Sequence, residues 1–461
     1  MNDGDAAHPD ILWVTLESVR YDHTSISDYE RDTTPNISLL ANEKGSSASN
    51  AYSHGIWTRA SSASILTGYP PAVHQTWSGE SSLPKNMETI PEQLQSRGYS
   101  TTAISANPQF GPDVGLDRGF DDFHLLRKET LINEVGVLST VKYILNLWRH
   151  SAGYTTKTNR HSLGYLTNEA AVQNLKRKSN QSPHFLYVHH FDTHHPYIPP
   201  KLWRSSFESP LGVKKSVELA EKMSSNLHKS IGDGVQFSGE ELQAITTMYD
   251  SLIRYVDTLV GRLTKTARKY LDNPIIVITS DHGEFFGEND LLAHMLSTHS
   301  AVCEVPMIVS GLPELPKDSP IQPADIWKVI SEENNLGLSV PAGHHYKSDP
   351  RKYAVVQRGK ERSQKKVDLI SKQSPTFDLN KFPTGNETSI IGNNYRLERI
   401  SEHTNLFKLD TEQASVKKEQ VDIMNAWLDE WEHKWSETNY SPERSDFSPS
   451  VQDQLSDLGY L

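Results

Sequence analysis

The sequence predicts an α/β/α sandwich: a mostly parallel central sheet between two helical layers, with a small C-terminal α+β subdomain. Short apolar runs rich in β-branched residues alternate with longer stretches of helical periodicity, which favours a parallel sheet covered on both faces. The 461 residues exceed what one minimal core requires. Apolar residues make up 36% of the chain and charged residues 23%, as is usual for a folded protein without low-complexity regions.

Five brief apolar runs, each bounded by turn-forming residues, are predicted to be buried strands: Ile11–Leu16, Thr101–Ser105, Phe185–His189, Ile275–Thr279 and Val305–Val309. A helix is predicted from about Ser238 to Lys269, because apolar residues recur there in three- and four-residue steps. The segment Ser205–Phe237 contains many Ser, Lys and Gly residues, and we expect it to be a surface excursion.

The composition changes after about Leu338, so we divide the chain into a catalytic domain, residues 1–338, and a subdomain with its tail, residues 339–461. A helix is expected over Lys417–Lys434, and residues 437–450 are expected to be a loosely held linker. Short polar strands are predicted before that helix, at Tyr353–Gln357, Ser389–Ile391, Tyr395–Ile400 and Leu406–Lys408.

Charge and composition exclude several classes of protein. The 58 acidic and 46 basic side chains give a formal charge of -12, which argues against nucleic-acid binding. The single cysteine cannot form an internal disulfide. No signal-peptide pattern begins the chain and no apolar run is long enough to cross a membrane, so we expect a cytoplasmic protein without an integral membrane segment. The sequence does not determine the oligomeric state.

Acidic and imidazole side chains directly follow two predicted strands. Glu17 follows Ile11–Leu16, and Ser280 precedes Asp281 and His282 at the end of Ile275–Thr279. Each group alone is explained by a helix cap or an ion pair, but their shared placement at one sheet edge favours a metal site. These ligands suit one divalent cation, Mn²⁺, Zn²⁺ or Mg²⁺, with Ca²⁺ as the alternative if His282 is not a ligand.

The stretch from Thr58 to Gly68 predicts a short helix that ends at the glycine. A hydroxyl at its first turn faces free N–H groups, which attract tetrahedral anions. If the metal also contacts the Thr58 oxygen, that hydroxyl becomes a usable nucleophile. The alternative is an ordinary N-cap threonine.

Histidines are concentrated around the third predicted strand. His189 and His194 are the candidates to contact an anionic substrate or to protonate a leaving group. His190 and His194 are alternatively spaced to hold a second metal. His184 and His195 need no role beyond that of solvated loop residues. Further along, either His294 or His299 could serve as a leaving-group acid or an anion ligand, and His299 is more simply structural.

From about Pro9 to Gly311 the sequence resembles the sulfatase branch of the alkaline phosphatase superfamily. The resemblance rests on several short motifs in a consistent order: Arg20–His23, Thr33–Asn36, Ser61–Gly68, Leu116–Asp121, His194–Tyr197, Tyr249–Asp257, Thr279–Glu284, Val305–Pro306 and the final Leu458–Leu461. It implies an alkaline phosphatase-like fold, a divalent metal and the cleavage or transfer of a sulfate or phosphate ester. It also implies that Glu17, Asp281 and His282 bind the metal, that Thr58 is the nucleophile, and that His189, His194 and His294 surround the substrate.

Two departures from the family pattern change the expected chemistry. Sulfatases carry cysteine or serine at the nucleophile position, followed by proline and arginine, and oxidise it to formylglycine; here the residues are Thr58, Ala60 and Ser62. The single cysteine is Cys303, so no formylglycine is expected. The usual acidic pair after the first strand is Glu17-Ser18, which with a threonine nucleophile is similar to lipoteichoic acid synthase-type enzymes.

The main hypothesis is therefore a metal-dependent enzyme that cleaves or transfers a sulfate or phosphate ester on a saccharide or glycan precursor through Thr58. One alternative is a sulfo- or phosphotransferase that modifies a sugar during surface-glycan assembly. Another is a catalytically degenerate protein that binds anionic glycans, which predicts no bound metal. The sequence does not distinguish sulfate from phosphate.

Overall fold

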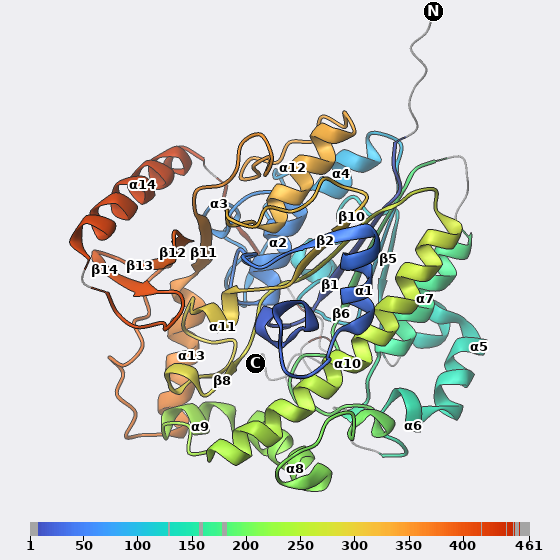
Figure 1. Ribbon diagram of the computed structural model, residues 1–461, viewed down its shortest axis with the longest axis horizontal. Helices are drawn as coiled ribbons and strands as arrows, with labels where there is room; N and C mark the ends of the chain where they lie inside the picture. Colours follow the sequence, from blue (N-terminus) through green and yellow to red (C-terminus); the bar gives the residue numbers. More distant parts are fainter. Residues whose placement is uncertain are drawn as a thin grey trace, which may run out of the picture.

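A seven-stranded sheet forms the centre of the chain, in the order β2-β10-β7-β1-β6-β4-β5 (Figure 1). The computed structural model describes residues 8–127, 130–155, 160–177, 182–415, 417–438, 440–445, 447 and 451. The strands β1, β4, β5, β6 and β7 are mutually parallel, whereas β10 is antiparallel to its neighbours. The predicted fold class is confirmed. The bounds are β1 Ile11–Leu16, β2 Gly45–Ala48, β4 Ser100–Ser105, β5 Asp122–Leu125, β6 His184–His190, β7 Ile275–Ser280 and β10 Met307–Ser310.

Alternation along β1 separates two hydrophobic cores, because successive side chains of a strand point to opposite faces. Leu12, Val14 and Leu16 belong to one core, whose helices are α1 (Pro35–Lys44), α7 (Gly164–Arg177) and α10 (Gly239–Tyr270). Ile11 and Trp13 belong to the other, beneath α2 (Thr58–Thr67), α4 (Ile90–Gln95) and α12 (Pro323–Glu333). Helices therefore cover both faces of the sheet, as the apolar strands require.

The predicted long helix is α10, and it starts at a capping box in which Ser238 and Glu241 each accept a backbone hydrogen bond. The segment 205–237, expected to be a surface excursion, does lie mostly at the surface, but the sequence did not predict that it is helical. This segment forms α8 (Gly212–Ser225) and α9 (Leu227–Gly232), which bury Leu219, Met223 and Ile231. Polar residues outnumber apolar ones in this segment, so its overall composition does not reveal the narrow apolar stripe along each helix.

A four-stranded antiparallel sheet, β11-β12-β13-β14, forms most of the C-terminal part. Helix α14 (Lys418–Ser436) buries Met424 and Leu428 against it, and α13 (Lys360–Gln373) packs against α9 of the main sheet region. The structure thus contains the expected α+β unit, while the division at residue 338 stays a prediction. The strand bounds are β11 Ala354–Arg358, β12 Glu387–Gly392, β13 Tyr395–Ile400 and β14 His403–Lys408.

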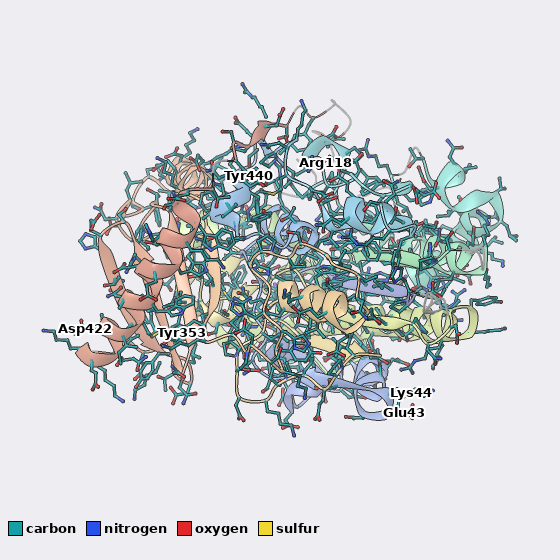
Figure 2. All side chains as sticks on the ribbon, turned by 90° about the horizontal axis from the view of Figure 1, so that it is seen from above. Glu43, Lys44, Arg118, Tyr353, Asp422 and Tyr440 are labelled. Carbon is teal, nitrogen blue, oxygen red and sulfur yellow. The ribbon has the colours of Figure 1, made fainter. Side chains whose placement is uncertain are left out.

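Described residues of the segment after α14 contact the main part of the molecule. The expectation of a loosely held linker is therefore wrong for these residues. The strand β15 (Glu443–Arg444) pairs with β3 (Ser81–Ser82), and the Phe447 ring lies 5.2 Å from the Arg59 guanidinium carbon. In Figure 2, Tyr353 and Asp422 lie in the C-terminal lobe, whereas Tyr440 lies over the main part of the molecule. The final Leu458–Leu461 motif falls outside the described residues.

The remaining short elements connect these layers: α3 Pro71–His74, α5 Leu131–Leu145, α6 Leu147–His150, α11 Ser300–Cys303, β8 Phe285–Phe286 and β9 Leu292–Ala293. In the part of the chain that the structure describes, no helix combines the length and apolar character needed to cross a bilayer.

Candidate active site

The register of the three central strands brings the predicted metal ligands together. Leu16, the last residue of β1, lies opposite His190 of β6 and Ser280 of β7. The next residues, Glu17 and Asp281, therefore leave the sheet side by side. Backbone hydrogen bonds continue past the strand ends, from Glu17 N to the His190 carbonyl at 2.9 Å and from Asp281 N to the Leu16 carbonyl at 3.3 Å.

Glu17, Asp281 and His282 each offer one ligand atom within 4.8 Å of the others, and all three side chains are fully buried. His282 Nδ1 donates to the Gly283 carbonyl at 2.9 Å, so the neutral ring carries its lone pair on Nε2. That atom lies 3.5 Å from Glu17 Oε1 and 3.5 Å from Asp281 Oδ2. Among the described residues, Asp281 Oδ2 has no hydrogen-bond partner.

This donor set fits a divalent cation, because buried carboxylate and imidazole lone pairs converge and, within the described part of the chain, Asp281 Oδ2 and His282 Nε2 have no hydrogen-bond partner. The negative charges of the two carboxylates also favour a positive charge at this position. Burial acts to lower the pKa of His282, but the carboxylates of Asp281 and Glu17 raise it to about 9. Burial and the Glu17 charge raise the pKa of Asp281 above its usual value, which shows how strongly two such carboxylates repel each other.

Glu17 also organises the proposed nucleophile. Thr58 Oγ1 donates to Glu17 Oε1 at 2.5 Å, and the other carboxylate oxygen accepts from His189 Nε2 at 2.6 Å and Asn107 Nδ2 at 2.8 Å. Burial acts to raise the pKa of Glu17, but the hydrogen bonds of His189 and His282 hold it well below its usual value. Glu17 is therefore an anion that orients the Thr58 hydroxyl.

The predicted short helix is present as α2, and Thr58 is its first residue. Trp57 is the extended N-cap residue, so the Thr58 side chain stands at the positive end of the helix. Gly68 closes the helix with a φ of 69° and donates to the Ser64 carbonyl at 2.9 Å. A side chain at Gly68 would meet Val340 Cγ1 at 2.7 Å, so both its left-handed backbone and its close packing require glycine.

The predicted substrate histidines gather around the same cluster. The His294 ring lies 4.4 Å from that of His282 and 5.4 Å from that of His194, measured between centroids. His294 Nδ1 lies 3.0 Å from Glu284 Oε1, and His194 Nδ1 donates to the His195 carbonyl at 2.6 Å. Burial lowers the pKa of His194 to about 4 and that of His294 well below its usual value. Both rings are neutral near pH 7. Because His194 Nδ1 donates to a carbonyl, His194 Nε2 carries a lone pair. Burial raises the pKa of Glu284 to about 8, so a Glu284 O–H can donate to His294 Nδ1 and leave an N–H on His294 Nε2 for an anion.

The other sequence candidates lie elsewhere. His190 points to the opposite face of β6 from His189, and burial followed by the neighbouring His189 lowers its pKa to about 3. Within the described residues, the metal-type cluster contains neither His190 nor His194, so the second metal stays a prediction. His299 is the N-cap of α11 and accepts from Ala301 N at 3.0 Å, which is a structural role.

Three residues beside the site were not anticipated. Asn107 follows β4, whose Ser105 lies opposite His189, so the strand-edge rule that found Glu17 could have found it. Arg362 and Lys366 come from α13, and the Arg362 guanidinium carbon lies 4.4 Å from the Trp57 ring, next to Thr58. Lys366 is only 5% exposed, and its charge acts on both His194 and His195. Nothing in the sequence of α13 distinguishes Arg362 and Lys366 from the other basic residues of this helix, so the sequence could not predict that these two lie beside the site.

The sequence model described as Sulfatase matches residues 9–334 of this chain, which include every predicted metal ligand. The chain belongs to the sulfatase family. Members of this family are metal-dependent, in agreement with the donor set formed by Glu17, Asp281 and His282. The predicted family resemblance is thereby confirmed.

Individual relatives are distant. An arylsulfatase from Clostridium perfringens is 24% identical over 316 residues, which cover 61% of this chain and 64% of that protein. A phosphonate monoester hydrolase of Agrobacterium radiobacter is similar in structure, with a TM-score of 0.67, 17% identity and coverage of 93% of this chain and 95% of that one. A 2-O GAG sulfatase also gives a TM-score of 0.67, with 15% identity and coverage of 97% and 96%. These structural similarities establish the fold.

Proposed function

We propose that this protein hydrolyses a sulfate ester of a saccharide, with Thr58 as the nucleophile. The proposal is carried by one observation: the Thr58 hydroxyl, at the N-terminus of α2, donates to the same carboxylate that completes the Asp281–His282 cluster. The names of the relatives support a sulfate ester, since an arylsulfatase and a 2-O GAG sulfatase are among them.

Glu17, Asp281 and His282 are proposed to hold a divalent cation, with the Thr58 oxygen next to it. When bound, such a cation supplies positive charge for sulfuryl oxygens and makes a nearby hydroxyl more acidic. The first turn of α2 adds N–H groups and the positive end of the helix dipole. Asn107 is proposed to help orient the Thr58 hydroxyl, since its Nδ2 donates to Thr58 Oγ1 at 3.4 Å.

The proposed reaction has two steps that both occur at sulfur. Thr58 Oγ1 passes its proton to the Glu17 carboxylate and forms a bond to sulfur while the bond from sulfur to the sugar oxygen breaks. The departing oxygen takes a proton from His294 Nε2, and the protonated Glu284 carboxyl replaces it at His294 Nδ1. Water then attacks the sulfur of the threonine ester and releases sulfate, which restores the hydroxyl. Arg362 and Lys366 are proposed to bind the charged groups of the substrate.

Transfer is the second candidate function, and the identity of the nucleophile favours it. A formylglycine hydrate carries a second hydroxyl that can expel the bound sulfate, whereas a threonine ester has none. The second step therefore needs an external oxygen nucleophile, and a sugar hydroxyl can take the place of water. Product analysis with and without a sugar acceptor separates transfer from hydrolysis. Aryl sulfate, phosphate monoester and phosphodiester substrates, tested in parallel, identify the ester.

The nucleophile is tested with Thr58→Ala and a matched control, Thr67→Ala, which removes another buried hydroxyl from the same helix. We expect Thr58→Ala to reduce kcat/KM by about a thousandfold or more, because no other group can form the covalent ester. Thr67→Ala should keep kcat/KM near the wild-type value. Mass spectrometry of quenched wild-type enzyme should find the added group on Thr58. Full activity of Thr58→Ala would exclude this residue as the nucleophile.

A further inference from the structure

Helices α5 and α6 present a continuous apolar face to solvent. Seven large side chains on them are between 44% and 71% exposed: Ile132, Val137, Leu138, Val141, Ile144, Leu145 and Trp148. Within α5, Leu138, Val141 and Leu145 follow one another at three- and four-residue steps and form a single stripe, and Trp148 follows on α6 after the break at Asn146. Figure 1 shows these two helices at the outer edge of the molecule, beyond α7. Isolated exposed apolar residues are common, but a contiguous patch of this kind indicates a binding surface.

The opposite face of α5 is firmly attached, so the exposed stripe does not reflect a displaced helix. Val135, Ser139 and Tyr143 are buried beside α7. Gln173 Nε2 of α7 donates to Ser139 Oγ at 2.8 Å, and Tyr143 OH donates to the Ser162 carbonyl at 2.6 Å. The attached face is mostly polar (Ser139, Thr140 and Tyr143), so the larger apolar face of α5 is the one exposed to solvent, which is the reverse of an ordinary surface helix and indicates a partner.

The charges around this face are positive. Lys142 and Arg149 are exposed beside the stripe, and Lys201 Nζ lies 3.3 Å from the centroid of the Trp148 ring. Between residues 130 and 155 the sequence contains one carboxylate, Glu134, which pairs with His124 at 2.6 Å. The chain as a whole carries a formal charge of -12, so this basic border is a local feature.

We propose that α5, α6 and the adjoining Lys201–Leu202 bind the surface of a bilayer that contains anionic lipids. An aliphatic stripe, a tryptophan at its end and a basic border match the acyl boundary, the interface and the headgroups of such a bilayer. Leu202 is 65% exposed and extends the apolar face beside Trp148. A second copy of this chain fits less well, because it would bring two basic borders together.

Co-sedimentation of the full-length protein with vesicles tests this surface. We expect binding to vesicles of equal parts phosphatidylcholine and phosphatidylglycerol, weaker binding to phosphatidylcholine alone, and a decrease with added salt. Replacing Leu138 and Leu145 together by Ser should weaken binding by about tenfold or more. The charge variant Lys142→Glu/Arg149→Glu should remove the preference for phosphatidylglycerol.

The matched control replaces two leucines on other surfaces, Leu39→Ser and Leu379→Ser, which are 46% and 57% exposed in the wild type. This control should bind vesicles like the wild type. None of these variants touches the Thr58 site, so activity on a soluble ester and the melting temperature should be retained. Absence of binding to the mixed vesicles, or binding that the Leu138/Leu145 change leaves intact, would overturn the proposal. A dimer that the same change converts to a monomer would instead identify a contact between copies.

Discussion

Lys366 provides a test of the site, because burying its charge lowers the free energy of unfolding by an amount that depends on pH. The side chain is 5% exposed, and burial, followed by the charges of Arg362 and Lys365, lowers its pKa from 10.5 to about 7. One pKa unit corresponds to about 1.4 kcal/mol, so keeping the lysine charged in the folded state costs up to about 5 kcal/mol at low pH. Lys366→Met has nearly the same shape and lacks this cost.

The sign of the pH dependence follows from proton counting. Between pH 7 and pH 10.5 the unfolded chain keeps the Lys366 proton while the folded chain has released it. The free energy of unfolding of the wild type therefore gains about 1.4 kcal/mol per pH unit from this residue in that window. Lys366→Met should be more stable than wild type by about 4 kcal/mol at pH 7 and by about 2 kcal/mol at pH 9.

Urea unfolding of both proteins at pH 7, 8 and 9 measures this difference. Lys365→Met is the matched control, because Lys365 is the exposed neighbour on the same helix and should give a nearly constant difference. At pH 6, where folded Lys366 keeps its proton, Lys366→Met should raise KM for an anionic sugar sulfate by about tenfold, since a charged contact is lost, and this effect should disappear towards pH 9. A stability difference that does not change with pH would refute the argument that Lys366 is a desolvated cation.

Two further outcomes are expected. Dialysis against a chelator should lower the melting temperature by several degrees, because the carboxylates of Glu17 and Asp281 then repel each other, and added Mn²⁺ or Mg²⁺ should restore it. Calorimetry checks this, and a melting temperature indifferent to the chelator would contradict the metal assignment. Arg358→Met should cost about 3–5 kcal/mol, because it leaves Glu387 as a buried charge without the partner now 2.5 Å away. Urea unfolding measures the loss, and the added change Glu387→Gln should recover part of it; no recovery would mean that packing, not charge, stabilises this pair.

Nearby residues were sufficient to predict the central part of the site. Buried parallel strands are continuous apolar runs, and their carboxyl ends meet at one edge, so Glu17 and Asp281 could be placed together without a structure. The same reasoning places Asn107, which was overlooked. The short helix from Thr58 to Gly68 was equally predictable, since its glycine stop is a local backbone requirement.

The errors concern segments whose structure depends on distant partners. The helices α8 and α9 were not predicted within the surface segment 205–237, because each buries only a narrow apolar stripe, and the surfaces that cover it belong to α10 and α13. The segment around Glu443 was taken for a linker because nothing in its own residues indicates pairing with β3.

The sequence by itself determined the layered α/β architecture, the cluster of polar residues at the strand edge and the family, because periodicity and motif order are properties of neighbouring residues. Tertiary structure alone decided which charges lie beside the candidate site. Helix α13 contains several basic residues, and its packing against α9 buries Lys366 while Lys365 stays exposed. Tertiary structure likewise decided that α5 buries its more polar face and presents its apolar face to solvent. Desolvation depends on which segments meet, and that is set by contacts between residues far apart in the chain.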